Sequence, residues 1–356
     1  MKQTIPSYWD EHLREKIERI HNRQISAGKS GTSVALITDM HWAENEKHSG
    51  ALMEKVLFEC GIPYFFNAGD LISGKGICTP QELLQDIIEY REQFKDIEHK
   101  CLMVEGNHDS AHSTFEPPAY YVENLPEKTF NEYYFRPYTQ YKDRVFSDEI
   151  SYYYADDTVH KVRYIVLNCQ NVPNDEKTEK GYAKYNRMLH FGFLQKQINW
   201  FANVALAVPD ATWNVVVCSH ATYYGALEED HAFNYNYDLM MNVINAFKKH
   251  TSYTGKTQHE NPLFNAEISV DFTGKGGNFV AWLGGHRHDD HINVLDGITL
   301  VDVATDASYE NYKKLGKRGK IEEHAFDVFT IDTKLHKVYV TRIGGGEDRE
   351  FDYEVF

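Results

Sequence analysis

The chain has 356 residues, of which 42% are hydrophobic and 14% aromatic, so it is long enough to bury a large core. Its formal net charge is −16 and it has no block of lysine or arginine, which argues against long DNA or RNA as a partner. The charged N-terminal stretch lacks the apolar segment of a secretory signal and no apolar run is long enough to span a membrane, so we expect a cytoplasmic protein.

The first half of the chain alternates between helical and strand patterns. A charged stretch predicts an amphipathic helix at 9–28, within a helical lead-in at 1–32. The pattern then predicts strands and helices in alternation, at 33–39, 50–60, 62–70, 80–95 and 100–109. Strand, helix, strand, helix, strand is the order of βαβ units on a parallel sheet.

Between 110 and 150 this regularity breaks. The stretch PPAYYVENLPEKTFNEYYFRPYTQYKDRVF is rich in Tyr, Phe and Pro, and we interpret it as an irregular insertion rather than an independent domain. It could overhang a site as a cap, and an apolar outer layer of the fold explains its composition nearly as well.

The second half repeats the alternation without a fixed period. The pattern predicts a hairpin at 151–169, a helix at 191–206 and a strand at 212–220. It then predicts a helix at 238–250, a strand at 278–288 and a β-rich tail at 325–356. No polar linker divides the chain, so we expect 33–356 to form a single domain.

Polar side chains follow five of the predicted strands, where each apolar run stops. They occur in the strings TDMH, AGD, GNHD, CSH and GGHRH, and they are Asp39, His41, Asp70, Asn107, His108, Asp109, His220, His286 and His288. Open α/β sheets place their sites at the carboxyl ends of strands, and a DxH or HxH spacing directs two side chains to one side of an extended segment. Carboxylate, amide and imidazole groups suit divalent Mn, Fe or Zn, so the sequence predicts a metal site. The five scattered cysteines, none in a CxxC pair, make a thiolate zinc site or a disulfide framework a poor alternative.

The ordered set DxH…GD…GNHD…H…GHxH, over roughly residues 33–305, resembles the calcineurin-like metallophosphoesterase superfamily. The resemblance implies an α/β fold, a sandwich of two mixed β-sheets flanked by helices, with two divalent metal ions (Mn, Fe or Zn). It implies one ion held by Asp39, His41 and His288, a second held by Asn107, His220 and His286, and Asp70 bridging the two. It also implies that His108 is a catalytic group beside the metals, with Asp109 as the carboxylate that orients it.

The function implied by this resemblance is hydrolysis of a small phosphodiester or phosphomonoester, nucleotides included. A hydroxide held between the ions would attack in line, and His108 as imidazolium would protonate the leaving oxygen. The alternatives are a non-catalytic metal-binding or scaffold protein on the same fold, which would usually lack some ligands, and a nuclease of the same superfamily, which the acidic balance disfavours.

Departures from the better-known branches of this superfamily narrow the choice of branch for this chain. Serine/threonine phosphatases carry an arginine before GNH, where this chain has Glu105, and purple acid phosphatases carry a metal-binding tyrosine where it has Ser73. The strings GDL, GNHD and GHxH are closest to the bacterial cyclic-nucleotide-phosphodiesterase-like group.

Four further polar residues lie near the motifs and are candidates for substrate binding: Asn45, His48, Tyr223 and Tyr224. The first two follow the first ligand pair and could line the pocket, although a surface loop explains them equally well. The two tyrosines follow His220 and could stack on a base, although packing in the core or a lid is the alternative. The sequence indicates neither the oligomeric state nor the substrate.

Overall fold

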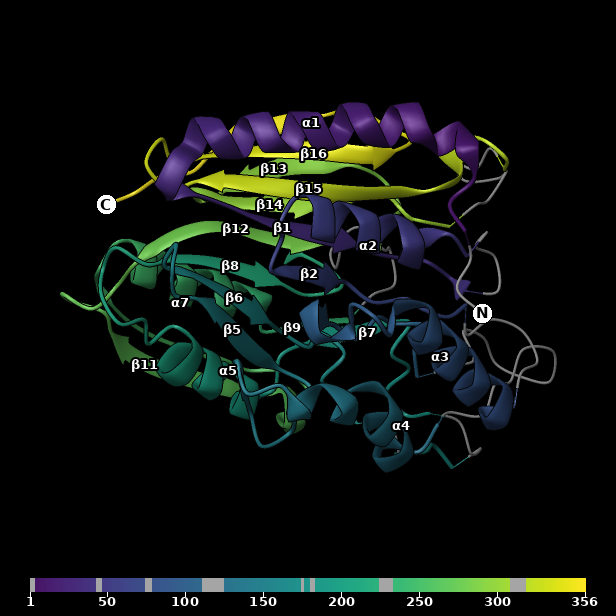
Figure 1. The fold of residues 1–356 in the computed structure, drawn as a ribbon. Helices are drawn as coiled ribbons and strands as arrows, with labels where there is room; N and C mark the ends of the chain where they lie inside the picture. Colours follow the sequence, from purple (N-terminus) through teal and green to yellow (C-terminus); the bar gives the residue numbers. More distant parts are fainter. Residues whose placement is uncertain are drawn as a thin grey trace.

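In the computed structural model two large mixed β-sheets face each other, and helices cover their outer faces (Figure 1). The structure describes residues 4–42, 47–73, 79–110, 125–173, 176–179, 183–223, 233–307 and 318–356. The six-stranded sheet has the order β17 (Arg349–Asp352), β16 (Lys337–Gly344), β15 (Ala325–Asp332), β1 (Gly31–Ile37), β2 (Tyr64–Asn67), β3 (Cys101–Met103). The seven-stranded sheet has the order β13 (His291–Leu295), β14 (Ile298–Asp302), β12 (Asn278–Gly284), β8 (Asn214–Cys218), β6 (Val162–Val166), β5 (Tyr153–Asp157), β4 (Arg144–Phe146). This arrangement confirms the predicted fold class.

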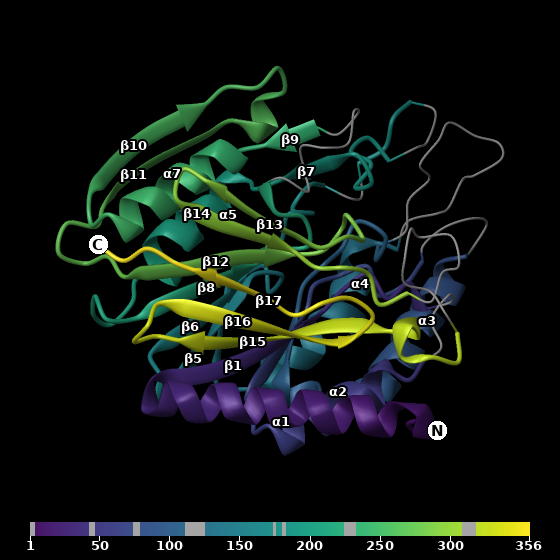
Figure 2. The same ribbon diagram turned by 90° about the horizontal axis from the view of Figure 1, so that it is seen from above.

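Helices form the two outer layers. The six-stranded sheet is covered by α1 (Asp10–Ala27), α2 (Ser49–Glu59) and α3 (Pro80–Phe94), with α4 (Glu127–Tyr134) beside them (Figures 1 and 2). The seven-stranded sheet is covered by α5 (Gln195–Trp200), its π-helical continuation Phe201–Ala205, α7 (Tyr237–Lys248) and the hairpin of β10 (Ser252–Thr257) and β11 (Ala266–Asp271). Two short strands, β7 (His190–Gly192) and β9 (Phe233–Tyr235), form a small parallel sheet. Short 3-10 turns occupy Ser7–Trp9, Gly28–Ser30, Glu98–Lys100, Arg136–Gln140, Pro262–Phe264 and Ile321–Glu323.

Buried strands with two apolar faces explain the layers. In β1, Val34 and Leu36 pack between the two sheets, whereas Ala35 and Ile37 pack under the helices. Successive side chains of a strand point to opposite faces, so a continuous apolar run supplies both interfaces at once. None of the described helices is long and apolar enough to cross a membrane.

The aromatic segment at 110–150 is more regular than predicted over its described part, 125–150. It forms α4, a 3-10 turn and β4, and its rings Phe130, Tyr134, Phe135 and Tyr138 are buried in the core beneath the helices. This described part is therefore an outer layer of the fold and not a cap. The predicted helix at 191–206 begins only at Gln195, because residues 190–192 pair with β9.

Candidate metal centre

The strands that carry the predicted ligands end together. In the six-stranded sheet β1, β2 and β3 are parallel, and in the other sheet β8 and β12 are parallel, with these carboxyl ends at one end of the sandwich (Figure 1). Beyond β1 and β2 the backbones stay side by side: the Asp39 amide donates to the Gly69 carbonyl at 3.0 Å, and the His41 amide donates to the Asp70 carbonyl at 3.0 Å. All seven predicted metal ligands therefore follow strands that stop at one place.

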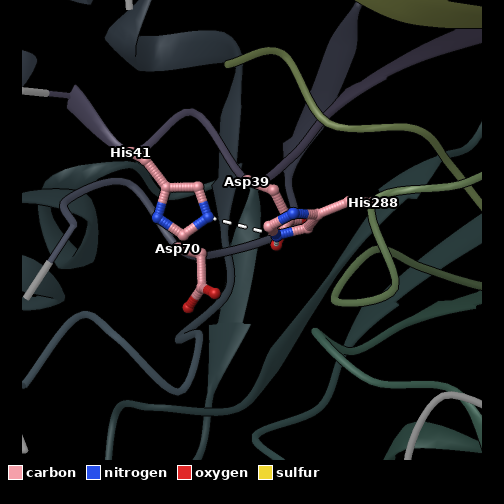
Figure 3. Close-up of side chains that lie close together, drawn as sticks. All are labelled: Asp39, His41, Asp70 and His288. Carbon is pink, nitrogen blue, oxygen red and sulfur yellow. Dashed lines mark hydrogen bonds and ion pairs between the residues drawn. The ribbon is translucent and has the colours of Figure 1, made fainter. Parts of the chain in front are cut away.

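One group of potential ligand atoms comes from Asp39, His41, Asp70 and His288, whose atoms lie within 4.8 Å of one another (Figure 3). His41 Nε2 and His288 Nε2 are 3.1 Å apart, and His288 Nε2 is 3.1 Å from Asp39 Oδ1. Two imidazoles and two carboxylates directed at one point are an ordinary ligand set for Mn, Fe or Zn.

A second group shares Asp70 with the first. Its ligand atoms come from Asp70, His220 and His286 and also lie within 4.8 Å of one another. The oxygen of Asn107, Oδ1, adds a fourth donor, 2.8 Å from His220 Nε2 and 2.9 Å from His286 Nδ1. A carboxylate common to two groups can bridge two ions.

Contacts outside these groups determine which atom of each ligand faces inward. Asp39 Oδ2 accepts hydrogen bonds from Thr38 Oγ1 at 2.7 Å and from the His286 amide at 2.9 Å, so Oδ1 faces His288. Asp70 Oδ1 accepts the His108 amide at 2.8 Å. Such outer contacts orient metal ligands and adjust their basicity.

The ligands of the second group are oriented in the same way. His220 Nδ1 lies 2.8 Å from the Ala68 carbonyl oxygen, which can only accept, so Nδ1 carries the proton and Nε2 points to Asn107. The Asn107 amide nitrogen donates to the sulfur of Met188 at 3.0 Å, which leaves its oxygen directed at the two imidazoles.

Five of the ligands have backbones in the left-handed region, which is uncommon for non-glycine residues: Asp39, His41, Asp70, His286 and His288, with φ of 52°, 43°, 53°, 72° and 58°. Such conformations persist only where the surrounding structure imposes them, and they gather at functional sites. The two central turns also interlock, because a Cβ on Gly106 would lie 2.1 Å from the Asp70 backbone nitrogen.

The protonation states of Asp39 and His41 suit cation binding. Burial raises the pKa of Asp39. The charge of His288 and the hydrogen bond between the two residues together have a larger effect and lower the pKa of Asp39 to about 2. Burial lowers the pKa of His41 to about 3, so its imidazole is neutral at pH 7. Ionised carboxylates and neutral imidazoles are the forms that bind metals.

His220 is the exception, because burial would lower its pKa but attraction to Asp70 raises it well above the ordinary value. His220 Nε2 and Asp70 Oδ2 are 3.4 Å apart, so one cation between them could bind both atoms. The donor set therefore fits two divalent ions.

His108 lies beside these groups. Its Nδ1 donates to the Ser73 carbonyl at 2.5 Å, and its Nε2 is 3.8 Å from Asp70 Oδ2. The ring is almost perpendicular to that of His41, with centroids 4.9 Å apart. Because Nδ1 is occupied by a carbonyl, Nε2 is the nitrogen that can gain or lose a proton toward the centre.

The prediction that Asp109 orients His108 is wrong. Asp109 instead accepts the backbone amides of Asp70 at 3.0 Å, Leu71 at 2.7 Å and Gly106 at 2.7 Å. These amides point inward at the GD and GNHD turns and need a buried acceptor, which takes up the carboxylate. The carbonyl of Ser73 orients His108, and Asp109 supports the two turns.

Of the four predicted substrate-binding residues, the two that the structure describes, His48 and Tyr223, lie in different surroundings. Asn45 and Tyr224 lie outside the described residues. The ring of His48 packs beside His324 at 5.9 Å, at the start of α2. The hydroxyl of Tyr223 donates to Asp238 Oδ1 at 2.6 Å and its ring lies 6.2 Å from that of Tyr237, so Tyr223 packs against α7.

One supporting residue missed in the sequence is Tyr134 of α4. Its hydroxyl lies 2.6 Å from Asp109 Oδ2 and 2.7 Å from the Val104 carbonyl oxygen, and its single proton serves these two acceptors. Burial raises the pKa of Asp109 to about 7, with the charge of Asp70 acting in the same direction. Nothing in the spacing of the aromatic segment identified this tyrosine among its neighbours.

A second missed residue is Arg187, the buried partner of Glu105. Arg187 Nη1 lies 2.5 Å from Glu105 Oε1, and Asn168 Nδ2 donates to Glu105 Oε2 at 2.9 Å. Burial raises the pKa of Glu105, and the charge of Arg187 acts in the opposite direction. An acidic residue inside an apolar strand end was a signal that a buried cation had to lie nearby.

Comparisons with known proteins give a family match for this chain. A family model described as calcineurin-like phosphoesterase matches residues 32–290, which is more than half of the chain. A search of the curated proteins found no match.

Solved structures with a similar course of the chain have low identity. GAP50, the anchor in the inner membrane complex of Plasmodium, is 11% identical over 92% of this chain and 89% of that chain, with a TM-score of 0.44. A candidate 5′-nucleotidase from Staphylococcus aureus is 12% identical over 90% of this chain and 54% of that chain, with a TM-score of 0.41. Phosphopantetheinyl hydrolase from Mycobacterium tuberculosis is 12% identical over 78% of this chain and 91% of that chain, with a TM-score of 0.32. At these TM-scores the likenesses carry no argument about function.

Proposed function

Because the chain belongs to the calcineurin-like phosphoesterase family, we propose that it is a dinuclear metal-dependent hydrolase of small phosphoesters. The observation that carries the proposal is the pair of ligand groups that share Asp70. The chemistry that two bound divalent ions supply is Lewis-acid activation of the phosphoryl group and of the attacking water. Asp39, His41, Asp70 and His288 would hold one ion, and Asp70, Asn107, His220 and His286 the other.

His108 is the general acid in this proposal. Its Nδ1 is held by the Ser73 carbonyl, so the proton that moves is the one on Nε2, on the side of Asp70. Transfer of that proton to the leaving oxygen typically contributes about 10² to 10⁴ in rate. The Ser73 carbonyl also stabilises the imidazolium form, because it accepts from Nδ1–H in both protonation states and more strongly from the charged ring.

The substrate in this proposal is a small phosphodiester or phosphomonoester, with nucleotides among the candidates. Glu105 in place of an arginine before GNH supports a branch other than the serine/threonine phosphatases, since Glu105 is an acidic residue paired with Arg187 and cannot supply the cation that grips a phosphate. The bacterial cyclic-nucleotide-phosphodiesterase-like group is the branch that we favour.

The test combines metal content with turnover. We expect Mn²⁺-loaded protein to hydrolyse members of a phosphoester library in which diesters and monoesters are compared side by side, and to bind two ions per chain. Asp70→Asn should weaken both metal sites and nearly abolish turnover, whereas Asp352→Asn, at an exposed position on β17, should change neither.

Two results would contradict parts of the proposal. A wild-type chain that binds two ions and hydrolyses no phosphoester would favour the non-catalytic alternative. Two tightly bound ions with normal rates in Asp70→Asn would remove the bridging assignment.

A further inference from the structure

The C-terminal strands reach the metal centre through an ionic cluster of two buried and two partly buried residues. This cluster, the C-terminal clamp, consists of Asp290, Asp327, Arg342 and Arg349. Three of its members belong to β15, β16 and β17, which lie beyond the segment 32–290 that matches the family model. The fourth, Asp290, is two residues beyond the ligand His288.

Arg342 is the centre of the clamp. It is fully buried, and its Nε and Nη2 donate to Asp327 at 2.8 and 3.1 Å. The same Nη2 donates to Asp290 Oδ1 at 2.5 Å, and Nη1 donates to the Gly345 carbonyl at 2.9 Å. Arg349 forms ion pairs with both aspartates. A planar guanidinium with donors in fixed directions can join two carboxylates in one geometry, which a lysine cannot do.

The clamp lies between two of the three segments that carry the ligands of the first group, the one after β1 and the one after β12. Asp327 lies in β15 directly opposite Leu36 of β1, and β1 leads into Asp39 and His41. Asp290 lies in the loop that carries His288, and it also accepts the Ala304 amide at 3.0 Å. Arg342 therefore joins β15, the neighbour of the strand that leads into Asp39 and His41, to the loop after His288.

The loop needs such a restraint. His288 has a φ of 58°, a strained backbone, and its Nε2 must approach both Asp39 and His41 to 3.1 Å. His286 in the same loop is already held from within the centre, because its amide donates to Asp39 Oδ2 and the Gly285 amide donates to the His220 carbonyl at 2.7 Å. The restraint from Asp290 therefore acts mainly on His288.

We propose that Arg342 and Asp290 are positioning residues for His288. Through them, the C-terminal strands of this chain hold a ligand of the first metal site in place. The inference rests on the proposed function for the identity of the ligands, but its test does not depend on turnover. Buried ion pairs are expensive to desolvate and often do little for stability, so a role in specifying one loop conformation gives a reason for a cluster of four charges here.

The experiment measures Mn²⁺ binding by calorimetry and by elemental analysis, with the full chain. We expect Asp290→Asn and Arg342→Lys each to weaken one of the two ions about 10- to 100-fold, the usual effect of removing an outer contact of a metal ligand, and to leave the other ion unchanged. Asp290→Asn leaves Arg342 paired with Asp327, so it remains informative if Arg342→Lys fails to fold.

The matched control is Lys337→Met on the same hairpin of β16 and β17. Lys337 pairs with the exposed Glu350 at 2.5 Å, away from the clamp, and its loss should change neither ion. Wild-type affinity for both ions in Asp290→Asn would overturn the inference, as would equal loss of both ions. A wild-type chain that binds two ions without turnover would overturn the proposed function alone, whereas one that binds no ion would overturn both.

Discussion

Replacement of Arg187 by methionine should destabilise the protein by leaving the Glu105 carboxylate buried without its cation. Arg187 and Glu105 are 2% and 1% exposed. Besides Glu105, the guanidinium contacts Glu127 Oε2 at 2.8 Å and the Val172 carbonyl at 2.8 Å. Methionine approximates the volume of the arginine stem, so the change removes charge and hydrogen bonds with little loss of packing.

The expected magnitude follows from burial. Removal of one partner from a buried ion pair costs about 3–5 kcal/mol, because the remaining charge is left in a medium of low polarity. An entropy of unfolding of about 2.1 cal/mol/K per residue, for 356 residues, amounts to roughly 750 cal/mol/K. The melting temperature should therefore fall by about 4–7 °C.

Differential scanning calorimetry of wild type, Arg187→Met and the double variant Arg187→Met/Glu105→Gln measures this effect. If the orphaned charge is the cause, the double variant should recover most of the lost stability, because a neutral amide is less costly to bury. Lys184→Met removes an exposed ion pair with Glu176 nearby and should change the free energy of unfolding by less than about 0.5 kcal/mol. An unchanged melting temperature in Arg187→Met, or a double variant no better than the single, would refute the reasoning.

Four further predictions concern the centre and its surroundings. His108→Asn should keep its metals and lose about 10² to 10⁴ in rate on an alkyl phosphoester, but much less on a nitrophenyl ester whose leaving group needs no proton; equal losses in steady-state assays would contradict the general-acid role. Tyr134→Phe removes the hydroxyl from Asp109 and should lower the free energy of unfolding by about 1.5–3 kcal/mol and reduce metal retention, whereas an unchanged melting curve and metal content would show that Tyr134 is dispensable. Burial lowers the pKa of His190 to about 4 from the ordinary 6.5, so between these pH values the unfolded chain binds a proton that the folded chain does not. The wild type should therefore lose stability relative to His190→Phe as the pH falls from 6.5 to about 4. Melting temperatures of the two proteins that change in parallel over this range would contradict the prediction. Plasmid DNA should be cleaved more slowly than small diesters, because the net charge of −16 repels polyphosphate backbones; faster cleavage of DNA would contradict it.

The sequence alone determined the strands and the residues that follow them. An apolar run that stops at a glycine or a polar residue is a local pattern, and the position of Asp39, Asp70 or His220 just after such a run can be read without knowledge of the rest of the fold. Because carboxyl ends of parallel strands share one edge, the convergence of these residues was also predictable. The structure places all seven predicted ligands together, in two groups with Asp70 in common.

The tertiary structure decided which atoms face one another and what holds them. The resemblance implied that Asp109 orients its neighbour His108, but in the fold Asp109 accepts the backbone amides of Asp70 and Leu71, 39 and 38 positions away. Arg187 meets Glu105 across 82 positions and Arg342 meets Asp290 across 52. Such partners depend on strand register and on the packing of segments that have no pattern in common, and a periodicity of two or of 3.6 residues carries no information about either.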